Sequence, residues 1–261
     1  MTILDQIIAS KKGEVRLKKS IVSVTQLENA DLFTKKTMSL CKSIVNSSIG
    51  IIAEHKRRSP SKAIINNSLS VEEVVKGYES YGAAGISVLT DTHYFGGSLE
   101  DLLLSRASVQ IPLLRKEFII DEYQLLEAKA FGADAILLIA AVLSTKEIKQ
   151  LSEFAQSLDL EVLLEVHNLD DLEKSIMPSL DLIGVNNRNL KNFEVSLQTS
   201  VDLAKHIPID FIKISESGIT LTEDIKLLRN FGYQGFLIGE NFMKTDNPGQ
   251  CFQQFINKLK E

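Results

Sequence analysis

Charged and amide side chains stand at the ends of several short apolar runs, where a folded chain could gather them for proton transfer. Glu54 ends one run with Lys56 two positions later, and Lys116 ends another. Glu165 and Asn186 stand at the ends of two later runs. Buried lysines and glutamates are rare unless paired, and pairing around one pocket shifts their pKa values toward acid and base work. This pattern favours a catalytic mouth over an ion-pair network that only closes the fold.

The apolar runs themselves predict eight buried strands. Each is nearly continuous in Ile, Val and Leu rather than alternating, which is typical of strands covered on both faces. The runs are residues 49–54, 85–90, 111–116, 134–140, 161–166, 181–186, 211–216 and 235–240.

The segments between the runs carry helix signals. Ser144 with Glu147, and Thr220 with Glu223, have the spacing of capping boxes. Strands that alternate with helices predict a parallel sheet, and eight similar units favour a closed (β/α)8 TIM barrel over a doubly wound sheet. Active sites of such barrels lie at the carboxyl ends of the strands, where the polar residues stand.

We expect residues 1–261 to form a single barrel domain. Residues 49–261 make the barrel, and residues 1–48 form an N-terminal helical extension packed on it. The apolar spacing that predicts an amphipathic helix in this extension comes from Leu4, Ile7, Ile8 and Val15.

Composition excludes several classes of partner. The net charge of −5 is spread among mixed charges without a basic stripe, so we expect no nucleic-acid partner. No apolar run is long enough for a membrane helix, and the N-terminus does not resemble a signal peptide. Cys41 and Cys251 fit neither a disulfide framework nor a metal site, and no two histidines have metal-ligand spacing. We expect a cytoplasmic protein, a monomer or a weak homodimer, with no metal.

Two glycines indicate a site for a phosphorylated small molecule. Gly218 follows the seventh run and Gly239 follows the eighth. Glycine lets backbone N–H groups approach an anion closely, and a nearby helix N-terminus adds a favourable dipole. One such glycine is usually only a turn, whereas the pair at these two positions favours phosphate binding.

The motifs that carry these residues resemble the indole-3-glycerol-phosphate synthase family. They run through all eight predicted strands in the family's order. IAEHKRRSPSK (52–62), PLLRKEF (112–118) and IGVNNRNL (183–190) are highly specific in combination. SESGI (215–219) and GADAILLI (132–139) alone would fit several phosphate-binding barrels.

The resemblance implies the substrate 1-(2-carboxyphenylamino)-1-deoxyribulose 5-phosphate, and neither a metal nor an organic cofactor. It makes Lys116 the general acid at the ketone oxygen and Glu165 the group that moves protons during dehydration. Lys56 would pair with the substrate carboxylate or a nearby acid and could donate a proton. Glu54 and Asn186 would orient these groups and bind hydroxyls.

The resemblance also implies three kinds of substrate contact. Arg188 would help to hold the anionic substrate and the catalytic carboxylates. The phosphate would be held by Ser59, Ser217, Gly218, Gly239 and the backbone N–H of Glu240. The aromatic ring would be walled by Phe95, Phe118, Leu137 and Leu190.

The chain departs from the family's pattern at three points. Glu117 stands where Asp is usual, and the added methylene could shift a supporting hydrogen bond. Ala63 stands where Gly is usual, which would strain the backbone if φ there is positive. The chain has no Trp, so the aromatic residue that often lines the site from the extension is replaced or absent.

Two other functions stay open at this point. One is another phosphosugar-binding barrel isomerase, although such enzymes lack the combination of Glu54, Lys56 and Lys116. The other is a non-catalytic barrel scaffold, which should have lost some of the proton-transfer residues. His167 shares a strand face with Glu165, and we expect it to be a satisfied structural histidine.

Overall fold

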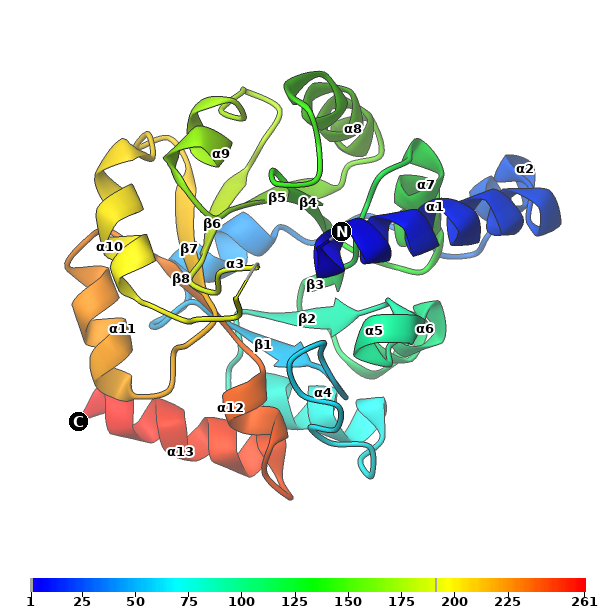
Figure 1. Ribbon diagram of the computed structural model, residues 1–261. Coiled ribbons are helices and arrows are strands. Elements are labelled where there is room, and N and C mark those ends of the chain that lie inside the picture. Colours follow the sequence, from blue (N-terminus) through cyan, green and yellow to red (C-terminus); the bar gives the residue numbers. More distant parts are fainter. Residues whose placement is uncertain (1, 191) are drawn as a thin grey trace.

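The protein is a closed barrel of eight parallel strands that pair in chain order, with β8 returning to β1. The computed structural model describes residues 2–190 and 192–261. Figure 1 shows the strands at the centre with the helices around them. The strands are β1 (Ile51–His55), β2 (Gly85–Leu89), β3 (Leu113–Lys116), β4 (Ala135–Ile139), β5 (Glu161–Val166), β6 (Leu182–Asn186), β7 (Ile212–Glu216) and β8 (Gly235–Ile238). All eight predicted strands are confirmed, and the doubly wound alternative is wrong.

Helices follow the strands and form the outer layer. Those before and along the first half of the barrel are α1 (Ile3–Ile21), α2 (Val24–Glu28), α3 (Leu40–Asn46), α4 (Val71–Ser80), α5 (Thr92–Phe95), α6 (Leu99–Ser108) and α7 (Glu122–Ala130). The second half has α8 (Thr145–Ser157), α9 (Leu169–Glu173), α10 (Gln198–Leu203) with the 3₁₀ turn η1 (Ala204–His206), α11 (Thr222–Arg229), α12 (Glu240–Met243) and α13 (Pro248–Lys260). None of the helices in these described ranges is long and apolar enough to cross a membrane.

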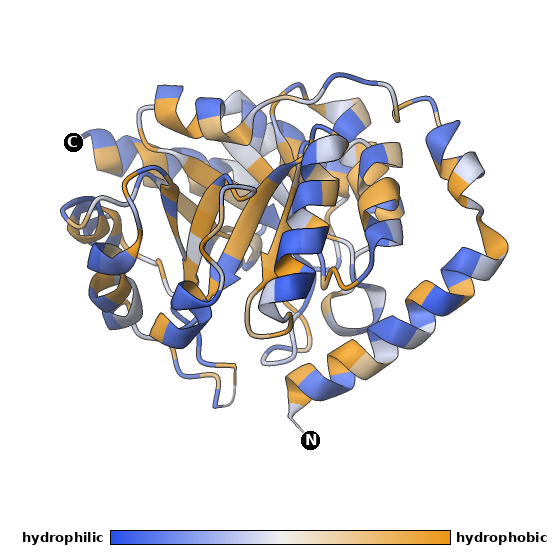
Figure 2. Cartoon of the chain, turned by 90° about the horizontal axis from the view of Figure 1, so that it is seen from above, coloured by the Kyte–Doolittle hydropathy of each residue, from blue (hydrophilic) through white to orange (hydrophobic). Residues whose placement is uncertain are grey.

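Two apolar layers hold the barrel together, and the strands between them are mostly orange in Figure 2. The outer layer lies between strands and helices. The inner layer fills the barrel with side chains such as Ile52, Leu114, Leu163 and Ile214, all fully buried. Because side chains alternate along a strand, the residue two positions after each of these faces the same way. Those residues are Glu54, Lys116, Glu165 and Glu216. The alternation of side chains therefore places three carboxylates and a lysine directly above the inner apolar layer.

The opposite end of the barrel is closed by α3. Leu40 and Ile44 of this helix are buried in the inner apolar layer. The backbone N–H of Cys41 donates to the Glu161 side chain at 2.9 Å, at the start of β5. This closure leaves the carboxyl ends of the strands as the face where a pocket can form.

The predicted amphipathic helix of the N-terminal extension is confirmed as α1. Its later half packs against α7, where Val15, Tyr123 and Leu126 share one buried cluster. The Tyr123 hydroxyl donates to the carbonyl of Val22 at 3.0 Å. The first turns of α1 reach the barrel mouth, as the dark blue helix in Figure 1 shows.

One of the two predicted capping boxes is wrong. Ser144 and Glu147 cap α8 reciprocally, as expected. The backbone stays extended through Leu221, however, so α11 begins at Thr222 rather than directly after Thr220. The Asp224 side chain, not that of Glu223, accepts the N–H groups of Thr220 and Leu221, each at 2.8 Å.

Candidate active site

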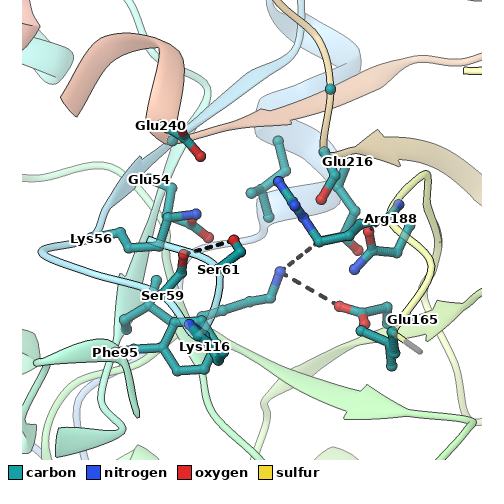
Figure 3. A pocket seen from close by; sticks show the side chains of 18 of the residues that line it. Glu54, Lys56, Ser59, Ser61, Phe95, Lys116, Glu165, Arg188, Glu216 and Glu240 are labelled. Atoms are coloured by element: carbon teal, nitrogen blue, oxygen red, sulfur yellow. Dashed lines mark hydrogen bonds and ion pairs between the residues drawn. The ribbon is translucent and has the colours of Figure 1, made fainter. Parts of the chain in front are cut away.

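A cavity of about 540 Å³ opens at the carboxyl ends of the strands (Figure 3). Pockets of this size suit ligands of the size of a drug or a sugar phosphate. The structure brings every residue expected from the sequence to this one cavity. These residues are Glu54, Lys56, Ser59, Phe95, Lys116, Phe118, Leu137, Glu165, Asn186, Arg188, Leu190, Ser217, Gly218, Gly239 and Glu240.

Lys116 at the end of β3 reaches across the cavity toward two carboxylates, Glu165 on β5 and Glu216 on β7. Its Nζ is 2.5 Å from Oε2 of Glu216 and 3.6 Å from Oε2 of Glu165, as the dashed lines in Figure 3 show. Burial lowers the pKa of the ammonium, but the charges of Glu216 and Glu165 outweigh burial and raise it above its ordinary value. Lys116 therefore carries a proton at neutral pH, and its ammonium points into the cavity.

The pKa values of the two carboxylates beside Lys116 are shifted in opposite directions. Burial opposes the charge of Glu165, yet Lys116 and His167 hold its pKa below the ordinary range. Burial raises the pKa of Glu216; the charge of Lys116 lowers it, but by less than burial and repulsion from Glu165 together raise it. Glu165 is thus the acceptor that stays ionised, and Glu216 is the carboxyl that takes up a proton more readily.

A second lysine–carboxylate pair lies at the carboxyl end of β1, where Glu54 belongs to the strand and Lys56 directly follows it. Lys56 Nζ is 2.7 Å from Glu54 Oε1, and the Ser87 hydroxyl donates to Glu54 Oε2 at 3.3 Å. Burial disfavours the charge of Glu54, but Lys56 and Lys116 hold its pKa below the ordinary value. A Cβ atom at Gly239 would lie 2.5 Å from Glu54 Oε1, so the close packing of Glu54 requires glycine there.

The expected phosphate side of the cavity is built by the loops after β7 and β8. Ser217 and Gly218 both have positive φ, 68° and 78°, which turns their backbone sharply at the cavity wall. The buried Asn187 holds this turn, because its amide nitrogen donates to Ser217 O at 3.1 Å and to Ser215 Oγ at 3.0 Å. Its amide oxygen accepts from the Ser200 hydroxyl at 2.8 Å.

The other side of the cavity is apolar. The rings of Phe95 and Phe118 lie with their centroids 5.9 Å apart, and both line the cavity together with Leu137 and Leu190. The chain has no Trp to line this side from α1. The aliphatic residues Ile3, Leu4 and Ile7 line it instead.

Asn186 and Arg188 lie between the two sides. The side-chain oxygen of Asn186 accepts from the Arg188 N–H at 3.0 Å, and a hydrogen bond from Asn186 contributes to the low pKa of Glu165. Arg188 donates to the carbonyl of Phe193 at 3.3 Å. Among the residues that the structure describes, the cation that pairs with both Glu165 and Glu216 is Lys116, and the contact of Arg188 with the catalytic carboxylates stays a prediction. The Arg188 side chain lines the cavity, where it is available to an anionic ligand.

Two residues beside the expected set were missed as site residues. Glu216 ends β7, in the same way that Lys116 ends β3. Because side chains alternate along a strand, Glu216 faces the barrel interior two positions after Ile214, and this alternation could have identified it. His167 has its Nε2 3.2 Å from Oε1 of Glu165 and its Nδ1 3.7 Å from Asp171. It was expected to be structural, but it contacts an expected catalytic carboxylate.

The departures from the family's pattern leave the site intact. Glu117 is buried and fully engaged, since its carboxylate accepts from the Thr90 hydroxyl at 2.9 Å and from the Phe118 N–H at 2.8 Å. Ala63 does not have positive φ, so the suspected backbone strain is absent there. In residues 2–190 and 192–261, no group of three or more His, Cys, Asp or Glu side chains could hold a metal ion.

Comparison with solved structures supports the fold. A mutant tryptophan synthase alpha-subunit from the hyperthermophile Pyrococcus furiosus superposes with a TM-score of 0.59, covering 81% of this chain and 97% of that one. The sequence identity is 13%, so this likeness concerns the fold alone.

Comparison with known sequences identifies the family. A family model described as indole-3-glycerol phosphate synthase matches residues 4–255. The protein of that name from Bacteroides thetaiotaomicron is 46% identical, covering 99% of both chains. The one from Aliarcobacter butzleri is 44% identical, covering 98% of this chain and 99% of its own. With these matches across the whole barrel, this chain belongs to the indole-3-glycerol phosphate synthase family.

Proposed function

We propose that this barrel closes the indole ring of 1-(2-carboxyphenylamino)-1-deoxyribulose 5-phosphate, with release of CO2 and water, through Lys116 and Glu165. The observation that supports the proposal is the placement of the Lys116 ammonium, 3.6 Å from one carboxylate and 2.5 Å from another, inside the cavity. The substrate's phosphate and aromatic ring match the two sides of that cavity.

Ring closure needs an acid at the ketone. The ring carbon that bears the carboxylate attacks the ketone carbon, and the carbonyl electron pair moves to oxygen. Lys116 stabilises this developing charge and transfers its proton, because an alkoxide is more basic than an amine. Glu216 lies in contact with Lys116 and takes up protons more readily than Glu165, so it is placed to return a proton to the lysine.

Loss of CO2 then restores the aromatic ring that closure disrupted. The bond between the ring and the carboxylate carbon breaks, CO2 departs, and the electron pair of that bond stays with the ring. Lys56 is held by Glu54 at 2.7 Å and lies at the cavity wall, where it pairs with the substrate carboxylate before that step. Dehydration follows, in which Glu165 removes the proton from the neighbouring carbon and an ammonium protonates the departing hydroxyl.

The remaining contacts anchor the substrate. The N–H groups at Gly218 and Glu240 and the hydroxyls of Ser59 and Ser217 bind the phosphate, with Arg188 adding charge. The side chain of Glu240 pairs with Lys62 at 3.2 Å, which reduces its repulsion of an anion. Anchoring at the phosphate end limits the motion of the reacting ring and ketone.

We propose a monomer, or a weak homodimer whose chains work separately, as the active unit. One chain supplies all the groups named above to a single cavity. Sedimentation of the active enzyme at assay concentration tests this, and a loss of specific activity on dilution into monomers would contradict it.

The reaction is tested by incubating the purified chain with the proposed substrate and a metal chelator. The expected product has lost the mass of one CO2 and one water and shows indole fluorescence, which stands out because the chain has no Trp. An isomer of unchanged mass would indicate a phosphosugar isomerase. Tight binding with no product would indicate a scaffold.

A further inference from the structure

The chain buries a lysine of the N-terminal extension that the proposed chemistry does not use. Lys11 of α1 is 1% exposed, and its Nζ lies 2.7 Å from Glu14, 2.9 Å from Asp91 and 3.1 Å from Glu117. A buried ammonium without partners would be very costly, and here three carboxylates surround it. Asp91 and Glu117 are themselves buried, and Lys11 is the cation nearest to each of them, since Arg115 lies farther from Glu117, at 3.9 Å.

One of these carboxylates fixes the chain beside the proposed acid. Glu117 directly follows Lys116. Its Oε1 contacts Lys11 and accepts the N–H of Phe118 at 2.8 Å, while its Oε2 accepts from Thr90 at 2.9 Å. The side chain of Glu117 therefore links the backbone that follows β3 to Thr90, which follows β2.

The other buried carboxylate fixes the facing wall. Asp91 caps α5, where its Oδ1 accepts the N–H of Tyr94 at 2.7 Å and that of Phe95 at 3.3 Å. Its second oxygen contacts Lys11. Lys11 thus joins the loops that carry Phe95 and Phe118, the two rings that stand side by side at the apolar end of the cavity.

We propose that Lys11 is a positioning residue for the reaction. It holds the loops after β2 and β3 together and anchors α1 on them. These contacts fix the positions of the Phe95 and Phe118 rings and the direction from which Lys116 approaches the substrate's ketone. The inference rests on the proposed function, since those two rings hold the substrate's ring. Without the ammonium, two buried carboxylates would face each other and repel, and the loops would separate. The first turns of α1 would leave the cavity with them, taking Ile3, Leu4 and Ile7.

The test compares Lys11→Met, which keeps the length and removes the charge, with Lys11→Arg and with Lys12→Met at the exposed neighbouring position. We expect Lys11→Met to lower kcat/KM by about 10²-fold, the loss typical of an ångström of misplacement, and Lys11→Arg to restore much of it. Affinity for a 2-carboxyphenylamino analogue that lacks the phosphate should fall. Inhibition by inorganic phosphate, which binds at the β7 and β8 loops, should stay unchanged, as should the activity of Lys12→Met.

Other outcomes would overturn the inference. A folded Lys11→Met enzyme with wild-type kcat/KM would show that the lysine positions nothing. An equal loss of affinity for the analogue and for phosphate would show a general loss of structure. If Lys11→Met does not fold, Glu117→Gln keeps the length and shape of the side chain, removes one charge and replaces one acceptor oxygen by a donor, and it should give a smaller loss confined to the aromatic side. Absence of product from the wild-type chain would refute the proposed function instead.

Discussion

The Nζ of Lys116 on β3 lies 2.5 Å from Oε2 of Glu216 on β7, so the two residues join opposite walls of the barrel across the cavity. Glu165 on β5 is farther from the same nitrogen, at 3.6 Å. Glu216 therefore determines the direction in which the ammonium points, although the motifs identified Lys116 and Glu165, but not Glu216, as site residues.

Replacing Glu216 with Gln should impair chemistry more than binding. The amide keeps the shape but loses the charge that holds Lys116, so the ammonium shifts toward Glu165 and away from the ketone. We expect kcat to fall by up to about 10²-fold with a smaller change in KM. Steady-state kinetics, with Glu223→Gln on the exposed side of α11 as the control, measure the effect. An unchanged kcat would show that the pair does not position Lys116.

The contacts of His167 predict a pH dependence of stability. Burial lowers the pKa of the imidazole, but Asp171 and Glu165 outweigh it and raise the pKa to about 9. An unfolded histidine has a pKa of about 6.5, so between these values the folded state binds the extra proton. The stabilisation is therefore complete below about pH 6.5 and is lost as pH rises through about 9, by roughly 3 kcal/mol.

Urea unfolding at a series of pH values, compared with His167→Asn, checks this sign. Glu216 and Lys174 also lie near the imidazole and its partner Asp171, and both remain in the variant. The difference in the free energy of unfolding between the two proteins should shrink as pH rises. A difference that grows with pH would mean that His167 is neutral in the folded protein.

Asn187 should contribute to both stability and phosphate binding. Its buried amide joins Ser200, Ser215 and Ser217, and Leu in its place would remove these hydrogen bonds. We expect Asn187→Leu to lower the free energy of unfolding by about 3 kcal/mol. KM should rise as the turn at Ser217 loosens. Thermal unfolding and kinetics test this beside Asn257→Leu, an exposed change on α13 that should have little effect.

A negative charge at position 217 should weaken substrate binding with little effect on kcat. The backbone there has φ of 68°, a conformation that Asp and Asn tolerate better than most residues. Ser217→Asn thus controls for size and backbone, and Ser217→Asp adds only the charge that repels phosphate. We expect a clear rise in KM for Asp over Asn. Equal KM values in the two variants would place the phosphate elsewhere.

The sequence predicted the barrel because strands buried on both faces are continuous apolar runs that differ from the helices between them. It predicted the members of the site because the ends of parallel strands converge in a barrel, wherever they stand in the chain. Side-chain contacts were less accessible. The pairing of Arg188 with the catalytic carboxylates was expected, whereas its guanidinium donates to the carbonyl of Phe193 in the loop after β6.

The misses have the same physical origin. His167 has a strand parity that identifies its face, but its contact with Asp171 depends on where α9 begins, and helix starts are poorly determined by sequence. The wrong cap of α11 is another case, since the extended backbone at Leu221 delays the start of the helix, and the capping acid is Asp224 instead of Glu223. Lys11 is the hardest case, because its partners lie in loops far along the chain.

The most direct test of the central claim is a single-turnover measurement on Lys116→Met. Wild-type and variant are mixed with the proposed substrate, indole fluorescence reports product, and calorimetry reports binding. The proposed role predicts that the variant still binds substrate while product formation falls by about 10²–10⁴-fold or more, the contribution of a positioned general acid. Product formation at a rate near that of the wild type would contradict the role of Lys116 as the acid.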